Sequence, residues 1–248
     1  MATACASIPV VAVKKNLAVS DLLKARRSVP RPPRWSALVC RGFALVSSRL
    51  PQLRQCFVSF PTPHLYEHPS SVASMAINRT YQDEPAVFFG LVQEPENLGL
   101  TEIGGRVQQF VDGPLLENGS FRRLIRNTKL PRPMRRLLWW YCVSASGRQK
   151  SKILGTFAVN SIASMGMEVC QFISPVTTML YYLPPSGSSE TLSIQLAFDH
   201  RVYDGSLASE ALVQLESVLN REIANEILGA STHPVSYTHL TLPTICSV

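Results

Sequence analysis

One of the five histidines in this 248-residue sequence lies in "FDHRVYDG", residues 198–205. His200 directly follows a strand-like apolar run, and an Asp-Gly pair stands four residues later. The end of a strand is a usual place for chemistry, because the scaffold fixes the side chain while substrate can reach it. An imidazole there can remove a proton near neutral pH. On the spacing alone a structural turn histidine is the favoured interpretation, and a catalytic base is the alternative.

The strand before His200 alternates apolar residues with polar or small ones, which predicts one buried face. The apolar positions are Leu192, Ile194, Leu196 and Phe198. His200 continues the same alternation, an even number of residues after each of these four. After it, Gly205 permits a sharp turn into a helix that Asp204 or Ser206 can cap. We expect Asp204 to anchor this turn through an arginine, for which Arg201 is a candidate.

Hydrophobic periodicity and proline positions predict the elements that carry this turn. Helices are expected at 17–29, 35–50, 99–111 and from 207 to 223. Residues 71–79 and 85–93 read as a hairpin, and further strands are expected at 152–160, 177–184 and 190–200. Residues 61–69 read as a proline-rich loop. The pattern predicts one α/β or α+β domain with a mixed sheet.

The H-x-x-x-D-G motif after an apolar strand resembles the signature of the coenzyme A-dependent acyltransferases that include chloramphenicol acetyltransferase. It is most similar to the catalytic domain of the dihydrolipoyl acyltransferases of 2-oxo-acid dehydrogenase complexes. Residues 154–182, "LGTFAVNSIASMGMEVCQFISPVTTMLYY", resemble a second stretch of that family, and "WSALVCRGFALVSSRLPQLRQCF" resembles one of its helices. The likeness runs in order over about 17–228. Only the His-Asp-Gly motif is specific by itself.

The resemblance implies an α/β (α+β) sandwich of the chloramphenicol acetyltransferase type, with helices packed on one side of a mixed sheet. It implies that His200 is a general base, activating a thiol, hydroxyl or amine to attack an acyl-coenzyme A thioester. It further implies a homotrimer whose active sites lie between subunits. A coenzyme A thioester is then a substrate, and no bound metal is expected.

Attack on a thioester creates an oxyanion, which a hydrogen-bond donor must stabilise. In the resembled family a Ser or Thr hydroxyl from the Gly-Thr-Phe strand supplies this bond. The matching position is Asn160, followed by Ser161. An Asn amide can donate as a hydroxyl does. Ser161 could substitute only if the strand shifted by one residue, which would turn its side chain to the other face.

The domain organisation departs from a complete dehydrogenase-complex subunit. We expect an N-terminal extension at 1–16 and the acyltransferase-like domain at 17–230, with no lipoyl domain in this chain. Residues 235–248, which include "VSYTHLTLPT", resemble a translated sequencing adapter. We interpret them as non-native and leave them out of the fold argument, with a natural flexible tail as the alternative.

Composition and residue spacing limit the partners, the cysteine chemistry and the metal sites that can be expected. The formal net charge of +7 suits an anionic ligand, but it does not by itself indicate nucleic acid, and we expect neither nucleic acid nor a membrane as partner. The six cysteines are scattered without a C-x-x-C pair, which favours reduced thiols and a cytoplasmic protein. His64 and His68 stand four apart, but the prolines at 63 and 69 argue against a helical metal site.

The most basic stretch, residues 121–140, carries seven Arg or Lys residues and no acid. We interpret it as a solvated helix pair hinged at "PRP", with its Leu and Trp residues packed inward. The alternative is a surface that contacts anionic groups. A non-catalytic relative that uses residues 121–136 to bind a partner or an anionic surface is therefore the rival to the enzyme hypothesis.

Overall fold

A mixed sheet of six strands forms the centre of the computed structural model, which describes residues 8–161 and 175–232. The strand order is β1-β8-β7-β6-β4-β5, and β4, β6 and β7 run parallel while the other neighbours are antiparallel. Its strands are β1 (Val10–Ala18), β4 (Val72–Tyr81), β5 (Glu84–Gln93), β6 (Phe157–Asn160), β7 (Thr178–Leu183) and β8 (Thr191–Asp199). The predicted hairpin is β4–β5, and the predicted fold class is confirmed.

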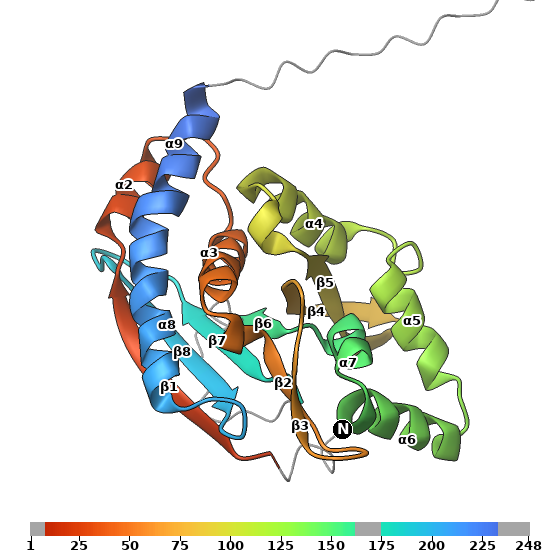
Figure 1. The fold of residues 1–248 in the computed structure, drawn as a ribbon. Helices are drawn as coiled ribbons and strands as arrows, with labels where there is room; N and C mark the ends of the chain where they lie inside the picture. Colours follow the sequence, from red (N-terminus) through yellow and green to blue (C-terminus); the bar gives the residue numbers. More distant parts are fainter. Residues whose placement is uncertain (1–7, 162–174, 233–248) are drawn as a thin grey trace, which may run out of the picture.

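Helices cover one face of this sheet, and a second group lies beside β5 (Figure 1). The first group comprises α2 (Ser20–Arg27), α3 (Trp35–Arg49), α4 (Leu100–Asp112), α8 (Gly205–Val218) and α9 (Ala224–Thr232). The second comprises α5 (Gly119–Thr128), α6 (Arg132–Trp140) and α7 (Gly147–Leu154). Short turns of helix complete the chain at η1 (Pro51–Arg54), η2 (Pro95–Asn97), η3 (Tyr141–Ala145) and η5 (Leu219–Ile223).

The core lies between the sheet and the first helix group. Phe43 of α3 meets Phe157 of β6 edge to face, with ring centroids 5.0 Å apart, so α3 is anchored over the middle of the sheet. The predicted apolar stripe of α8 is buried as expected, at Ala208, Ala211, Leu212 and Leu215. Burial of this continuous apolar surface is the main force that holds the helices to the sheet.

A tight turn leads from α7 into β6, one of the inner strands of the sheet. Gly155 has a φ of +81°, and a Cβ there would lie 2.7 Å from the Val72 carbonyl oxygen. The next residue, Thr156, donates its N–H to that same oxygen at 2.7 Å and accepts the Val72 N–H on its hydroxyl at 2.9 Å. The strand expected to begin at residue 152 therefore begins at Phe157, because the preceding residues form the end of α7.

Two predictions about the chain ends and loops were wrong. Residues 10–16, expected to precede the domain, belong to β1, an edge strand paired antiparallel with β8. The predicted loop at 61–69 contains β3 (His64–Glu67), which pairs with β2 (Gln55–Val58) in a small separate sheet. The predicted tail at 235–248 lies outside the described residues.

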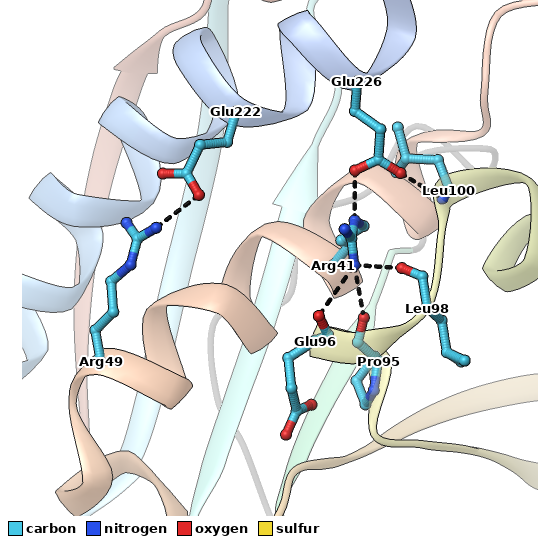
Figure 2. Close-up of polar contacts among 8 residues, drawn as sticks. All are labelled: Arg41, Arg49, Pro95, Glu96, Leu98, Leu100, Glu222 and Glu226. Carbon is cyan, nitrogen blue, oxygen red and sulfur yellow. Dashed lines mark hydrogen bonds and ion pairs between the residues drawn. The ribbon is translucent and has the colours of Figure 1, made fainter. Parts of the chain in front are cut away.

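A charged cluster joins the four helical segments α3, α9, η2 and α4 (Figure 2). Arg41 of α3 donates from Nε to a Glu226 carboxylate oxygen at 2.5 Å, and its Nη1 donates to the carbonyl oxygens of Pro95, Glu96 and Leu98 in the η2 region. The other Glu226 oxygen accepts the Leu100 N–H at 2.8 Å, at the start of α4. A charge-assisted network of this kind is strong because few of its groups remain free for water.

We expect Arg41→Met to lower the free energy of unfolding by about 2 kcal/mol, because the largely buried Glu226 carboxylate and three carbonyls lose their donor. Arg49 provides a matched control. It pairs with Glu222 at 2.6 Å, but both side chains are more than two-fifths exposed, so Arg49→Met should cost less than about 1 kcal/mol. Urea unfolding of both variants measures the difference. Equal losses would contradict the assigned role of Arg41.

Candidate active site

The turn after β8 presents His200 to solvent. Its side chain is exposed, although Phe198, which has the same parity in the strand, is buried. The strand ends at Asp199, and the His200 N–H donates to the Pro9 carbonyl oxygen at 2.9 Å. The N-terminal segment therefore holds the backbone of the histidine, and the imidazole is left accessible.

An ion pair around the histidine fixes the turn. The Arg201 guanidinium donates from Nε and Nη2 to the two Asp199 carboxylate oxygens, at 2.9 and 2.7 Å. The Asp199 side chain is only 3% exposed, and Arg201 also lies 4.4 Å above the Phe57 ring of β2. Arg201 thus anchors the turn as predicted, but through Asp199 and not through Asp204.

Asp204 caps the following helix. Its Oδ1 accepts the N–H groups of Ser206 and Leu207, each at 3.1 Å, so the first of the two predicted caps is correct. Gly205 is the first residue of α8, lies outside the left-handed backbone region, and would meet nothing within 4 Å if it carried a Cβ. The backbone at this position therefore does not require glycine.

We expect Asp204→Ala to lower the free energy of unfolding by about 1 kcal/mol, because two N–H groups of the first turn of α8 lose their acceptor. Asp204→Asn should cost less, since its amide oxygen can accept the same bonds. Thermal unfolding of both variants checks this order. A larger loss for asparagine than for alanine would contradict the capping role.

Tyr203 packs on the buried side of the turn. Its ring stacks on Phe198 with centroids 4.8 Å apart, and its hydroxyl shares a 2.7 Å hydrogen bond with the Thr178 hydroxyl of β7. Burial raises the pKa of this phenol well above its usual value, so Tyr203 stays neutral. The backbone that carries His200 is thus fixed to the sheet on its buried side.

Asn160 lies at the end of β6 with its amide held in one orientation. The side-chain oxygen accepts the Ala76 N–H of β4 at 2.9 Å, so the NH₂ group is the part of the amide that donates. A neighbour across the strands is Tyr181, whose phenol pKa is raised by burial, while a side-chain hydrogen bond with Asn160 opposes the rise. Asn160 is therefore an oriented amide donor. Ser161 directly follows the strand and is half-buried.

The strand register places Asn160 and His200 far apart. Asn160 aligns with Tyr181 of β7, which aligns with Gln195 of β8, five residues before His200. At about 3.3 Å per residue and about 4.8 Å per strand, the two side chains are on the order of 20 Å apart in one chain. This separation is what the resemblance leads us to expect. In a single chain these groups cannot act on one thioester.

The basic stretch forms the predicted helix pair, α5 and α6, broken near Pro131. Phe121 and Ile125 of α5 are buried, but α6 buries none of its side chains fully. Met134, Leu137 and Trp140 are 55%, 65% and 46% exposed. The prediction that the Leu and Trp residues of this segment pack inward is therefore wrong for Leu137 and Trp140 of α6.

The histidines outside the turn have separate environments. His64 of β3 is exposed, and its Nδ1 lies 2.8 Å from the Thr62 carbonyl oxygen. His68 is buried, and burial together with the nearby Lys150 and Arg54 lowers its pKa to about 4. Among the residues the structure describes, no three His, Cys, Asp or Glu side chains gather as a metal site would require, and no helix is both long and apolar enough for a membrane span.

Comparison with known proteins gives structural likeness without sequence likeness. No protein-family model and no curated protein matches the sequence. A probable dihydrolipoamide acetyltransferase from Listeria monocytogenes has a TM-score of 0.58 at 17% identity, covering 88% of this chain and 87% of that one. The Azotobacter vinelandii dihydrolipoamide acetyltransferase has a TM-score of 0.60 at 15% identity, with 91% and 86% covered. Chloramphenicol acetyltransferase has a TM-score of 0.51 at 10% identity, with 86% and 89% covered.

These likenesses show the fold. The chain has the architecture shared by dihydrolipoamide acetyltransferase catalytic cores and chloramphenicol acetyltransferase, as the sequence motifs led us to expect. The Azotobacter enzyme was studied for the roles of a serine, a histidine and an asparagine in its catalytic mechanism, and its histidine and asparagine stand four residues apart.

Proposed function

We propose that this chain is a coenzyme A-dependent acyltransferase in which His200 is the general base. The observation that carries the proposal is the exposed imidazole on a turn fixed by Pro9, the Asp199–Arg201 pair and Tyr203. A base held rigidly in a solvent-reachable place is what proton removal from an acceptor requires. The Azotobacter enzyme, which has the same fold, has a histidine among the residues studied for catalysis, which supports the assignment.

The proposed reaction is direct transfer of the acyl group. His200 accepts the proton of a thiol, hydroxyl or amine, and the acceptor attacks the carbonyl carbon of an acyl-coenzyme A thioester. The oxyanion that forms accepts a hydrogen bond from the Asn160 amide. Collapse of the intermediate breaks the C–S bond, and coenzyme A leaves as the thiol after taking the proton from His200. One oriented donor of this kind contributes about 3 kcal/mol to lowering the barrier.

The proposed assembly is a homotrimer with shared active sites. His200 and Asn160 are too far apart in one chain, and the resembled acyltransferases place these two positions opposite each other across a subunit boundary. A second chain would supply His200 to the Asn160 of the first. Mass measurement at micromolar concentration should therefore give a trimer, and a monomer alone would contradict the shared site.

Release of free coenzyme A tests the activity whichever acceptor the chain uses. Acetyl-coenzyme A and longer acyl-coenzyme A thioesters would be offered with a panel of amines, alcohols and thiols. Free thiol is measured with the amines and alcohols, and the transfer product is measured by mass with the thiols. We expect acceptor-dependent turnover with at least one class. Turnover at the no-protein rate across the panel would contradict the proposal.

A binding module is the second candidate function, and the exposed side of α6 favours it. Met134, Leu137 and Trp140 stand exposed among Arg132 and Arg136, a combination typical of helices that lie on anionic interfaces. Sedimentation with anionic vesicles tests this function. Salt-sensitive binding that is lost in the Arg132→Glu, Arg136→Glu double variant would support it, and no binding at low salt would exclude it.

A further inference from the structure

A cavity of about 250 Å³ lies beside the outer strand β5, between it and the helices α5, α6 and α7. One wall is formed by Val87, Phe89 and Leu91, which alternate along β5 with the buried Phe88 and Val92. These three side chains therefore face away from the main core. The cavity is a separate apolar compartment and not a defect of core packing.

The helices complete an apolar lining. Leu124 of α5, Leu138 and Trp139 of α6, and Leu154 of α7 all border the cavity. Cys142 adds a buried thiol, and desolvation raises its pKa, which keeps this part of the wall uncharged. An aliphatic chain can be desolvated fully against such a surface.

Three cations border the same cavity, one from each helix. They are Arg123, Arg135 and Lys152, and the lining contains no carboxylate. Within the described part of the chain, none of the three forms an ion pair with an acidic side chain. No acidic side chain in the described ranges therefore neutralises their positive charge.

Backbone oxygens contact both guanidinium groups. Arg123 donates from Nη1 to the Lys152 carbonyl oxygen at 2.9 Å, and Arg135 makes a longer contact from Nη1 to the Thr128 carbonyl oxygen at 3.4 Å. A guanidinium has five N–H donors, so each retains donors for another acceptor. Cations at the edge of an apolar cavity suit a carboxylate or a phosphate, which bind arginine in a fork geometry.

We propose that this cavity binds an amphiphilic anion, with an aliphatic tail against β5 and α6 and a carboxylate or phosphate head against Arg123, Arg135 and Lys152. β5 is four strands from β8, about 19 Å across the sheet, so His200 of the same chain takes no part. The site does not depend on the proposed acyl transfer. It would remain if the chain had no transferase activity.

Calorimetric titration of the intact protein tests the proposal, with decanoate and decyl phosphate below their critical micelle concentrations and decanol below its solubility limit. At least one of the two anions should bind saturably and at least tenfold more tightly than decanol, and the tighter anion identifies the preferred head group. Octanoate should bind about tenfold more weakly than decanoate, because decanoate transfers two more methylene groups from water into the cavity. Equal affinity for decanol and both anions, or no saturable binding, would overturn the proposal.

Neighbouring arginines on α6 provide matched variants. Arg135 borders the cavity, whereas Arg136 is exposed and does not border it. Arg135→Ala should weaken binding of the preferred anion at least tenfold, and Arg136→Ala should change it less than twofold. Equal weakening by both variants would show general surface attraction and would overturn the site. The chain-length series needs no variant, so it decides the question even if a substitution disturbs folding.

Discussion

Replacement of His200 by alanine is expected to lower the rate of acyl transfer by about 100- to 10,000-fold, the range typical of losing a general base. The ring is exposed and its centroid lies 5.8 Å from that of the buried Phe198 ring, while the turn is held through Asp199, Arg201 and Tyr203. The melting temperature should therefore stay within about 2 °C of wild type. Coenzyme A release under saturating thioester measures the rate.

His64 supplies the matched control for this substitution. It is another exposed histidine, on β3, and it has no role in the proposed reaction. His64→Ala should retain full activity. A similar loss in both variants would point to a general effect of removing an imidazole, and an unchanged rate in His200→Ala would exclude His200 as the base.

Replacement of Arg201 by methionine is expected to lower the free energy of unfolding by about 3 kcal/mol, because a carboxylate that is 3% exposed loses its bidentate partner. The cation–π contact with Phe57 is lost as well, while methionine keeps much of the side-chain volume. The turn that carries His200 would then lose its anchor, so activity should fall together with stability. Urea unfolding and coenzyme A release measure the two effects.

The double variant Asp199→Asn, Arg201→Met separates the effect on stability from the effect on activity. An uncharged amide needs no ionic partner, so the double variant should recover part of the lost stability. It should not recover the activity, because the bidentate geometry is absent. A double variant less stable than Arg201→Met alone would contradict the view that the unpaired carboxylate causes the loss.

Local patterns in the sequence predicted the elements whose own residues decide their conformation. The β4–β5 hairpin and α8 follow from alternation and from a 3.6-residue apolar period, and both are where they were expected. β1 was missed because an edge strand is defined by its partner β8, which lies far away in the sequence. β3 was missed because its flanking prolines indicate a loop, although prolines are tolerated beside a short edge strand.

The candidate site was predicted only in part, because local patterns identify residues but not their long-range contacts. Its motif identified His200, Asp204 and Asn160 as residues of interest, but not the contacts that orient them. The motif did not single out Asp199, which is the last residue of β8 and whose carboxylate is buried against Arg201. The bond from the Ala76 N–H that orients Asn160 depends on strand pairing, which alternation alone does not specify. The cations of the β5 cavity come from three helices whose packing no local pattern encodes.

Restoration of activity in mixed assemblies tests the shared active site most directly. His200→Ala and Asn160→Ala would each be produced alone for comparison. The two variants would also be co-expressed with different tags, and assemblies that carry both tags would be isolated. Each variant alone should be impaired by about 100-fold or more. If His200 of one chain acts with Asn160 of the next, one of the three boundaries in each trimer that carries both tags has both residues intact, so its activity should be about one third of wild type. Mixed assemblies no more active than the separate variants would contradict a catalytic site formed by His200 and Asn160 across the subunit boundary.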